Sequence, residues 1–428
     1  MKKLSTVFLA SIFVQFLFAQ TFTTYTDTSS GLIHNDVHCA DIATNNTVWF
    51  GTTGGVAIYD GSTWSSHTTS SDSNLVDNGI MALTILSSGN VWVGTDFGAS
   101  LYDGSSWTTY TETDGLGDNR VEAIFEDSNG DIYFGTSDGL TLFDGTNWTS
   151  WGTSDGLPFG GITHINKDSE GTIWLGTGLG GFAEFDGTDF ELTTEDERLI
   201  NDKVTAVAID NGDNRWVGTA EGVSVFNDDG WFVENHTIML VLSPPDTINP
   251  VQDVEIASDG NIWAGIYIDY LSGGGVAWFD GASWIDYHVS DGLAGPIVRD
   301  LAIDGNDDVW VATSTGVTHI TNVPASNNWN GWDNNPAYPE DTVSTYISGF
   351  EVEVEMKLFP NPAVDQITLQ VSGQQAVQLV EIISMQGQTL KSIETTNQVT
   401  VHDLIPGVYL AKVTTGDATA FLRFLKRR

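Results

Sequence analysis

The chain has 428 residues, with 15 Lys and Arg against 57 Asp and Glu, so its formal net charge is −42 at pH 7. Such a chain repels nucleic acid and anionic lipid, and we expect neither as a partner. Its 15 Trp argue against disorder. The single cysteine, Cys39, excludes an intrachain disulfide and a multi-cysteine zinc site, and we expect it to act as a small buried hydrophobic residue.

Residues 1–20 have the pattern of a secretory signal peptide. Lys2 and Lys3 precede an apolar run over Val7–Phe18, and the small residue Ala19 follows it. No later segment approaches the roughly 20 apolar residues that a spanning helix needs. We therefore expect an exported chain whose mature part has no transmembrane segment.

A repeat occupies most of the mature chain. Its mark is an aromatic residue two positions before a Gly-Thr pair, with two degenerate copies, Trp263-Ala-Gly-Ile and Trp310-Val-Ala-Thr, and it recurs at steps of 41 to 47 residues. The seven aromatic positions are Trp49, Trp92, Tyr133, Trp174, Trp216, Trp263 and Trp310. One unit, Arg120–Trp151, contains four short strand-like segments separated by SNG, SDG and DG turns. Four antiparallel strands per repeat predict an all-β fold, a seven-bladed β-propeller over residues 21–325, with the aromatics packed between blades.

The seventh unit lacks a clean copy of its last strand. The opening phrase TFTTYTDTSSGL resembles SWTTYTETDGL within the repeat, so that Phe22 matches Trp107 and Tyr25 matches Tyr110. We therefore predict that the N-terminal strand completes the seventh blade and covers its edge. The alternative is closure by Trp329, which lies in NNWNGW.

The D-x-x-G-x-I-W-x-G-T-x-x-G-L pattern of these units resembles the two-component regulator propeller repeat, a periplasmic sensor module of hybrid histidine kinases. It recurs from Thr21 to Asn322. No kinase core or receiver domain follows in this sequence, so the resemblance implies the propeller fold without the signalling role. We expect a standalone propeller.

The C-terminal part has a different composition. Residues 326–350 are rich in Asn, Pro, Ser and Thr and are expected to form a linker. Residues 351–428 alternate strand-like segments with turns and predict a small C-terminal β-sandwich. This part resembles the C-terminal sorting domain of the type IX secretion system at Pro360, Asn361, Pro362, Gly387, Pro406, Gly407, Tyr409, Lys426, Arg427 and Arg428.

The resemblance implies that the type IX secretion machinery is a partner. It also implies passage through the periplasm and a product that is secreted or attached to the outer surface. The basic end of an otherwise acidic chain fits an addressing role. The alternative is a cohesive C-terminal β-domain without that role.

Two insertions distinguish the units. The interval from Trp231 to Val254 is 23 residues where four other units have 14, and the interval from Trp263 to Phe279 is 16 where the others have 10 or 11. The first insertion joins an outer strand to the next inner strand, and the second joins the second and third strands of the sixth unit. In a propeller both kinds of loop open on the same face, where function commonly lies. Neutral drift of surface loops is an equal alternative.

The candidate ligand-binding residues lie on that face. Tyr267 and Tyr270 in the second insertion suit stacking on a sugar, and Asp269 between them suits accepting its hydroxyl hydrogens. Three basic residues stand at or beside the start of an inner strand, and pairing with the many surrounding acids is the alternative for each: Arg120, Lys203 and Arg299.

Catalytic and metal sites are not predicted. The eight His have no zinc-ligand spacing. The acidic segments Glu126–Asp131 and Asp304–Asp308 fall at hairpins and lack the calcium loop spacing, which favours turns over calcium sites. No cofactor is expected.

The function that the sequence favours is a binding or adhesion module for glycan or protein at the cell surface. The alternatives are a polysaccharide lyase or hydrolase, which would bring enzymatic activity, and a structural surface protein.

Overall fold

The computed structural model describes residues 20–158, 160–195, 199–227, 232–236, 250–267, 274–279 and 284–323 of the repeat region. In the C-terminal part it describes residues 356–359, 366–371, 377–384, 389–394, 398–404, 407–415 and 419–426. The chain forms two compact units, Met1–Asp333 and Asn334–Arg428. None of the helices in these described ranges is both long enough and apolar enough to cross a membrane.

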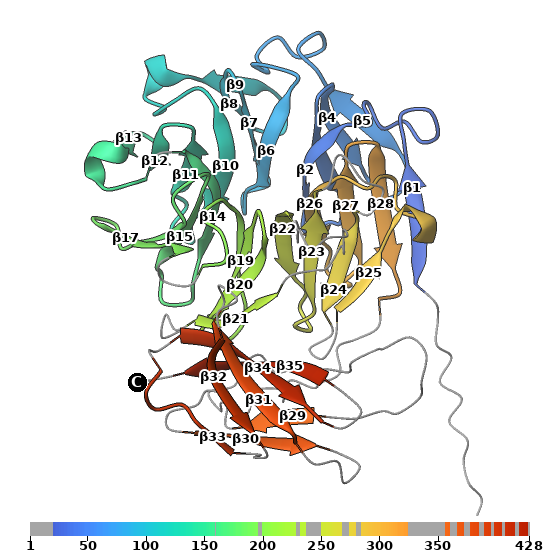
Figure 1. The fold of residues 1–428 in the computed structure, drawn as a ribbon. Helices are drawn as coiled ribbons and strands as arrows, with labels where there is room; N and C mark the ends of the chain where they lie inside the picture. The colour runs from blue at the N-terminus through green and yellow to red at the C-terminus, as the bar shows by residue number, and fades with distance from the viewer. Residues whose placement is uncertain are drawn as a thin grey trace, which may run out of the picture. The chain divides into compact units, whose positions relative to one another are not determined.

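Seven four-stranded antiparallel sheets form the blades of the first unit, which confirms the seven-bladed propeller (Figure 1). Blades one to three are β2 Val37–Ile42, β3 Val48–Thr52, β4 Gly55–Tyr59, β5 Trp64–His67; β6 Ile80–Ile85, β7 Val91–Thr95, β8 Gly98–Tyr102, β9 Trp107–Tyr110; and β10 Val121–Glu126, β11 Ile132–Thr136, β12 Gly139–Phe143, β13 Trp148–Trp151. Blades four and five are β14 Ile162–Lys167, β15 Ile173–Thr177, β16 Phe182–Phe185, β17 Phe190–Thr193; and β18 Val204–Ile209, β19 Arg215–Thr219, β20 Gly222–Phe226, β21 Phe232–His236. Blades six and seven are β22 Val251–Ile256, β23 Ile262–Ile266, β24 Val276–Phe279, β25 Trp284–Tyr287; and β26 Val298–Ile303, β27 Val309–Thr313, β28 Gly316–Thr321, β1 Thr21–Tyr25. In the described parts of the propeller, three short 3-10 helices lie between blades: η1 Glu112–Asp114, η2 Thr153–Asp155 and η4 Val289–Asp291.

The Gly-Thr pair found in the first five repeats has a packing role and a turn role. In blade one, a Cβ on Gly51 would come within 2.4 Å of the Sγ atom of Cys39 in the same blade and within 2.6 Å of Ile80 in blade two, because the next blade packs directly on this strand. The hydroxyl of Thr52 donates to the carbonyl of Gly55 at 2.7 Å and closes the turn into β4. Gly55 has φ of 128°, a conformation that disfavours side chains. The repeated motif therefore sets both blade spacing and hairpin shape.

The anchoring aromatics pack between blades, as predicted. Trp92 is buried, and its ring meets Phe134 of the next blade at 5.1 Å in an edge-to-face arrangement. Trp310 of blade seven meets Phe50 of blade one at 5.7 Å. Such pairs add about 0.5–1.5 kcal/mol each to the burial of their area. Cys39 is also buried, which confirms the prediction that it acts as a small buried hydrophobic residue.

The ring closes through the N-terminal strand. Strand β1 pairs antiparallel with β28, Phe22 opposite Ile320 and Tyr25 opposite Val317. The ring of Tyr25 lies 5.7 Å from that of Trp310, and burial, with the hydrogen bond to Tyr59, raises the pKa of Tyr25 to about 12. This is the pairing that the sequence predicts, and Trp329 lies outside the described residues.

The inner strands have unpaired edges at the axis, and side chains of the preceding blade satisfy them. Asp41 accepts from the N–H of Ile85 at 2.7 Å, and Asp253 accepts from the N–H of Leu301 at 2.9 Å. Asp300 of blade seven accepts from the N–H of Ala40 at 2.6 Å and so joins the last blade to the first. Hydroxyl and amide groups donate to carbonyls of the next blade elsewhere, from Thr84, Thr163, Asn166 and Thr205.

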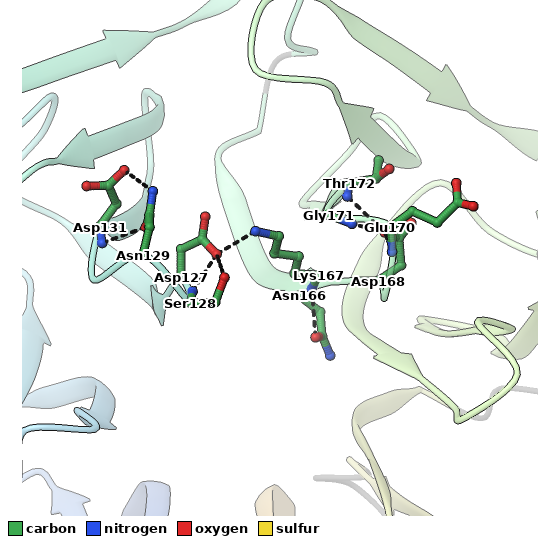
Figure 2. A network of polar contacts seen from close by, with 10 residues as sticks. All are labelled: Asp127, Ser128, Asn129, Asp131, Asn166, Lys167, Asp168, Glu170, Gly171 and Thr172. Atoms are coloured by element: carbon green, nitrogen blue, oxygen red, sulfur yellow. Dashed lines mark hydrogen bonds and ion pairs between the residues drawn. The ribbon is translucent and has the colours of Figure 1, made fainter.

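Blades three and four make no such axial bond among the described residues, and an ion pair joins them instead (Figure 2). The ammonium of Lys167, at the end of β14, binds the carboxylate of Asp127 in the turn after β10. Burial opposes ionisation of Asp127, but Lys167 and Ser128 together hold the pKa of Asp127 below its usual range. Three other blade pairs are joined on the same face by a serine that donates to an acid of the next blade: Ser87 to Glu126, Ser169 to Asp213 and Ser258 to Asp307.

The second unit contains two antiparallel sheets around one core, as the sandwich prediction requires. The sheets follow the orders β29-β30-β33 and β32-β31-β34-β35. Their strands are β29 Met356–Phe359, β30 Gln366–Val371, β31 Leu379–Ser384, β32 Thr389–Glu394, β33 Gln398–Thr400, β34 Gly407–Thr414 and β35 Thr419–Lys426. The core includes Ile367 of β30, Val380 of β31 and Val413 of β34, all fully buried.

Candidate functional site on the mouth face

One end of the propeller carries both predicted loop types. The turn between the second and third strands of a blade is hydrogen-bonded to the residue at the start of the inner strand: Ser137 N–H to Arg120 O at 3.1 Å and Ala220 N–H to Lys203 O at 3.0 Å. Ser314 N–H reaches Ile297 O in the same way, at 3.1 Å. We call this end, where the inner strands begin, the mouth face.

Four side chains from three blades meet on the mouth face, and we call them the mouth cluster: Asp36, His38, Tyr267 and Arg299. The guanidinium of Arg299 binds Asp36 at 3.0 Å and lies 6.0 Å from the ring centre of Tyr267. Burial, then the charge of Arg299, lowers the pKa of His38, although Asp36 lies 3.4 Å away. The N–H of Tyr267 donates to the carbonyl of Pro250 at 2.9 Å, which fixes the backbone at the start of the insertion. The cluster therefore combines a paired cation, a neutral imidazole and an aromatic ring.

The other predicted binding residues are not brought into this cluster. Arg120 is engaged by Glu122 at 2.6 Å and Asp96 at 3.5 Å. Lys203 is exposed and makes no ion pair with the residues that the structure describes. Asp269 and Tyr270 lie outside the described residues, as does most of the first insertion. Of the three predicted cations, Arg299 alone joins Tyr267.

Two exposed hydrophobic residues on the mouth face escaped the sequence analysis. Phe97 and Leu179 are 62% and 63% exposed at the tips of the second-to-third-strand turns of blades two and four. Phe97 occupies the turn position that Asp138 has in blade three and Glu221 has in blade five. Val289 in η4, on the same face, is 47% exposed. Aligning the turns of the repeats would have singled out Phe97 as the apolar exception.

Four acids lie deeper along the inner strands, and burial raises the pKa of each: Asp41, Asp253, Glu255 and Asp300. After burial, the charge of Asp253 is the next largest cause that raises the pKa of Asp300. Burial lowers the pKa of nearby His164. Because Asp41, Asp253 and Asp300 also cap the inner strand edges, their first role is structural.

Replacing Asp41 with Asn is expected to stabilise the propeller at pH 7.5. Burial raises the pKa of Asp41 to about 6, so the folded state favours the protonated form. Its contribution to stability is present at pH 4 and is lost as the pH rises to 6, a change of about 1–3 kcal/mol. Asp41→Asn should raise the melting temperature at pH 7.5 and leave it nearly unchanged at pH 4, because Asn keeps the acceptor for Ile85.

The matched control is Asp103→Asn. Hydrogen bonds from Ser105 and Ser106 lower the pKa of this exposed carboxyl to about 2, so its replacement should not stabilise at pH 7.5. Equal gains for Asp41→Asn at both pH values would show that the buried charge is not the cause.

Few of the predicted sorting residues fall in described segments. Gly407 and Tyr409 lie in β34, where Gly407 pairs with Lys426 of β35 and Tyr409 is buried in the core. The others lie outside the described residues: Pro360, Asn361, Pro362, Gly387, Pro406, Arg427 and Arg428.

Three solved structures illustrate the likeness of the fold. One, from B. thetaiotaomicron, is described as the extracellular domain of a hybrid two-component system, and it is 19% identical with a TM-score of 0.60 over 95% of this chain and 57% of that one. PorZ, a surface component of the type-IX secretion system of Porphyromonas gingivalis, is 17% identical with a TM-score of 0.56 over 93% of this chain and 60% of its own. Virginiamycin B lyase from Staphylococcus aureus is 13% identical with a TM-score of 0.56 over 71% of this chain and 100% of its own. The chain thus spans less than two thirds of the first two proteins.

Two families match the sequence, while no curated protein does. The family described as two component regulator propeller matches residues 115–138 and 156–178, in blades three and four. The family described as secretion system C-terminal sorting domain matches residues 357–427, which indicates export and attachment at the outer surface. The chain therefore joins a propeller with segments that match the two component regulator propeller family to a C-terminal part that matches the secretion system C-terminal sorting domain.

Proposed function

We propose that the propeller is a binding or adhesion module of the cell surface that takes glycan or protein on its mouth face. The observation that carries the proposal is the exposure of Phe97 and Leu179 at turn tips of that face. Large apolar side chains that point into water are stabilised when a partner covers them. The sorting domain supports the location, because it indicates export to the outer surface, where extracellular ligands are available.

The mouth cluster supplies the polar part of such an interface. Tyr267 offers a ring face and a hydroxyl, which suit a sugar or a protein side chain. Arg299 is held by Asp36 at 3.0 Å, so its orientation is set before a ligand arrives. Arginine and aromatic residues dominate the energetics of protein interfaces. An uncharged or mildly acidic ligand suits this cluster better than a polyanion, because the propeller is strongly acidic.

The test is a screen of the full-length chain against glycans and bacterial surface proteins. Once a ligand is found, Phe97→Asp and Tyr267→Ala should each weaken its binding by about 1–3 kcal/mol without lowering the melting temperature. Phe97→Asp copies the residue that blade three has at the same turn position, so the fold should tolerate it.

The matched control is Ile285→Thr. Ile285 is 38% exposed on the outer strand of blade six, away from the mouth face, and Thr is found at that position in blades two and three. Full affinity in both mouth-face variants would show that the binding site lies elsewhere.

A second candidate, an enzyme acting on polysaccharide, is favoured by one observation. Asp253 and Asp300 lie on neighbouring inner strands and each has a raised pKa, and a carboxyl that keeps its proton can serve as a general acid when substrate reaches it. Incubation with a polysaccharide panel distinguishes the two candidates. Product that disappears in Asp300→Asn supports the enzyme, and saturable binding without product supports the module.

A further inference from the structure

We propose that Asp304, Asp308 and His319 form a divalent-metal site in blade seven that takes zinc. One ligand atom from each of the three side chains lies within 4.8 Å of the others. The site is at the end of the blade opposite the mouth face, since Asp304 and Asp308 bound the turn from the first strand to the second. It is therefore independent of the proposed ligand-binding surface.

The turn holds the two carboxylates in place. The N–H of Asp304 donates to the carbonyl of Asp308 at 2.9 Å, which closes the turn. The Oδ1 atom of Asp304 accepts from the N–H groups of Asn306 and Asp308, at 2.8 and 3.1 Å. The Oδ1 atom of Asp308 accepts from the N–H of Asn322 at 3.2 Å. Each carboxylate thus has one oxygen engaged by the backbone and a second oxygen available to an ion.

The imidazole of His319 gives an independent sign of a ligand. Its ring stacks on Trp310 at 4.0 Å with an interplanar angle of 9°, which sets its orientation. Its Nε2 atom is buried and has no hydrogen-bond partner among the described residues. A buried polar nitrogen without a partner is unfavourable, and coordination to a metal would satisfy it.

The other blades show that this set of ligands is not a requirement of the repeat. His319 stands opposite the anchor residue Trp310, a position where blades one, two, three, five and six have Ile58, Leu101, Leu142, Val225 and Trp278. Blade four has Glu184 there. Blade three has both turn acids, Asp127 and Asp131, but its third-strand residue is Leu142. The histidine is what converts an acidic turn into a metal-ligating group.

The ligand types favour zinc over calcium. Calcium takes six to eight oxygens, whereas zinc binds imidazole nitrogen and carboxylate oxygen with four ligands in total. Three protein ligands leave one position for water, as in catalytic zinc sites that have three protein ligands. His319 lies in β28, the strand that pairs with the N-terminal strand β1, and Thr23 of β1 stands opposite it. The metal would therefore also link the first turn of blade seven to β28.

The test is calorimetric titration of the chelator-treated full-length chain with zinc, together with its melting temperature with and without zinc. We expect one saturable site and a higher melting temperature with zinc. His319→Leu, which copies blades two and three, should weaken zinc binding by about tenfold or more. Asp304→Asn should do the same while keeping the Oδ1 acceptor of the turn, and it tests the site should His319→Leu fail to fold.

The matched control is Asp131→Asn in blade three, where an acidic turn has no histidine beside it, and zinc affinity should be unchanged. Absence of saturable zinc binding in the unaltered chain would overturn the proposal. Unchanged affinity in a folded His319→Leu protein would overturn it too. So would calcium binding at this turn that is indifferent to His319→Leu, since it would identify an oxygen-only site.

Discussion

Removal of Thr21–Thr26 from the propeller is expected to lower its melting temperature by about 10 °C or more and to cause aggregation. The deletion removes β1, so β28 becomes an exposed edge with unpaired backbone groups. It also removes Phe22 and Tyr25, whose rings pack against Tyr287 and Trp310. Each ring is worth about 3 kcal/mol, and 1 kcal/mol shifts the melting temperature of a large domain by about 2–4 °C.

Point variants separate packing from edge pairing. Phe22→Ala and Tyr25→Ala keep the backbone pairing of β1 and should each destabilise by part of the effect of the deletion. Thr23→Ala is the matched control, because Thr23 lies in the same strand and is exposed. Differential scanning calorimetry at neutral pH measures all four proteins. A deletion that melts like the unaltered chain would assign ring closure to another segment, such as that around Trp329, or to an open ring.

The closing strand was predictable because it obeys the rule of the repeat. Phe22 and Tyr25 stand where Trp107 and Tyr110 stand in blade two, and a blade with an uncovered edge demands a partner. The blades were predictable for the same reason, since turn chemistry and the aromatic anchor recur with each unit. The turn residues and the aromatic anchors of each unit favour the same blade structure that ring closure requires, so both can be predicted from the sequence.

The bonds between blades were not predictable, because they depend on register across the axis. The carboxylate of Asp300 accepts a hydrogen bond from the N–H of Ala40, which is 260 residues away in the sequence, and no local sequence pattern predicts this contact. The mouth cluster has the same origin, because it joins Tyr267 to Asp36 through Arg299 only after ring closure. The candidate metal ligand His319 was not predictable for a different reason. It has no other metal-ligand residue near it in the sequence, and only strand pairing places it opposite Trp310.

A chain that ends at Gly349 is expected to fold and to accumulate in the periplasm, while the full-length chain reaches the outer surface. The predicted signal peptide would still carry the shortened chain across the inner membrane. It would lack residues 357–427, the segment that matches the sorting domain. Fractionation with an antibody to the propeller measures the distribution, and surface protease digestion distinguishes exposed from periplasmic protein.

Two variants distinguish loss of the sorting signal from a mere change in chain length. Removal of Arg427 and Arg428 alone tests the basic end, and Tyr409→Ala tests the folded core of the sorting domain, in which Tyr409 is buried. Because the propeller and the C-terminal unit are separate compact units with separate cores, none of these changes should alter the melting of the propeller. A shortened chain found at the surface in normal amounts would contradict the addressing role. A shortened chain that is degraded in the periplasm, with its propeller unfolded, would show instead that the C-terminal unit contributes to stability.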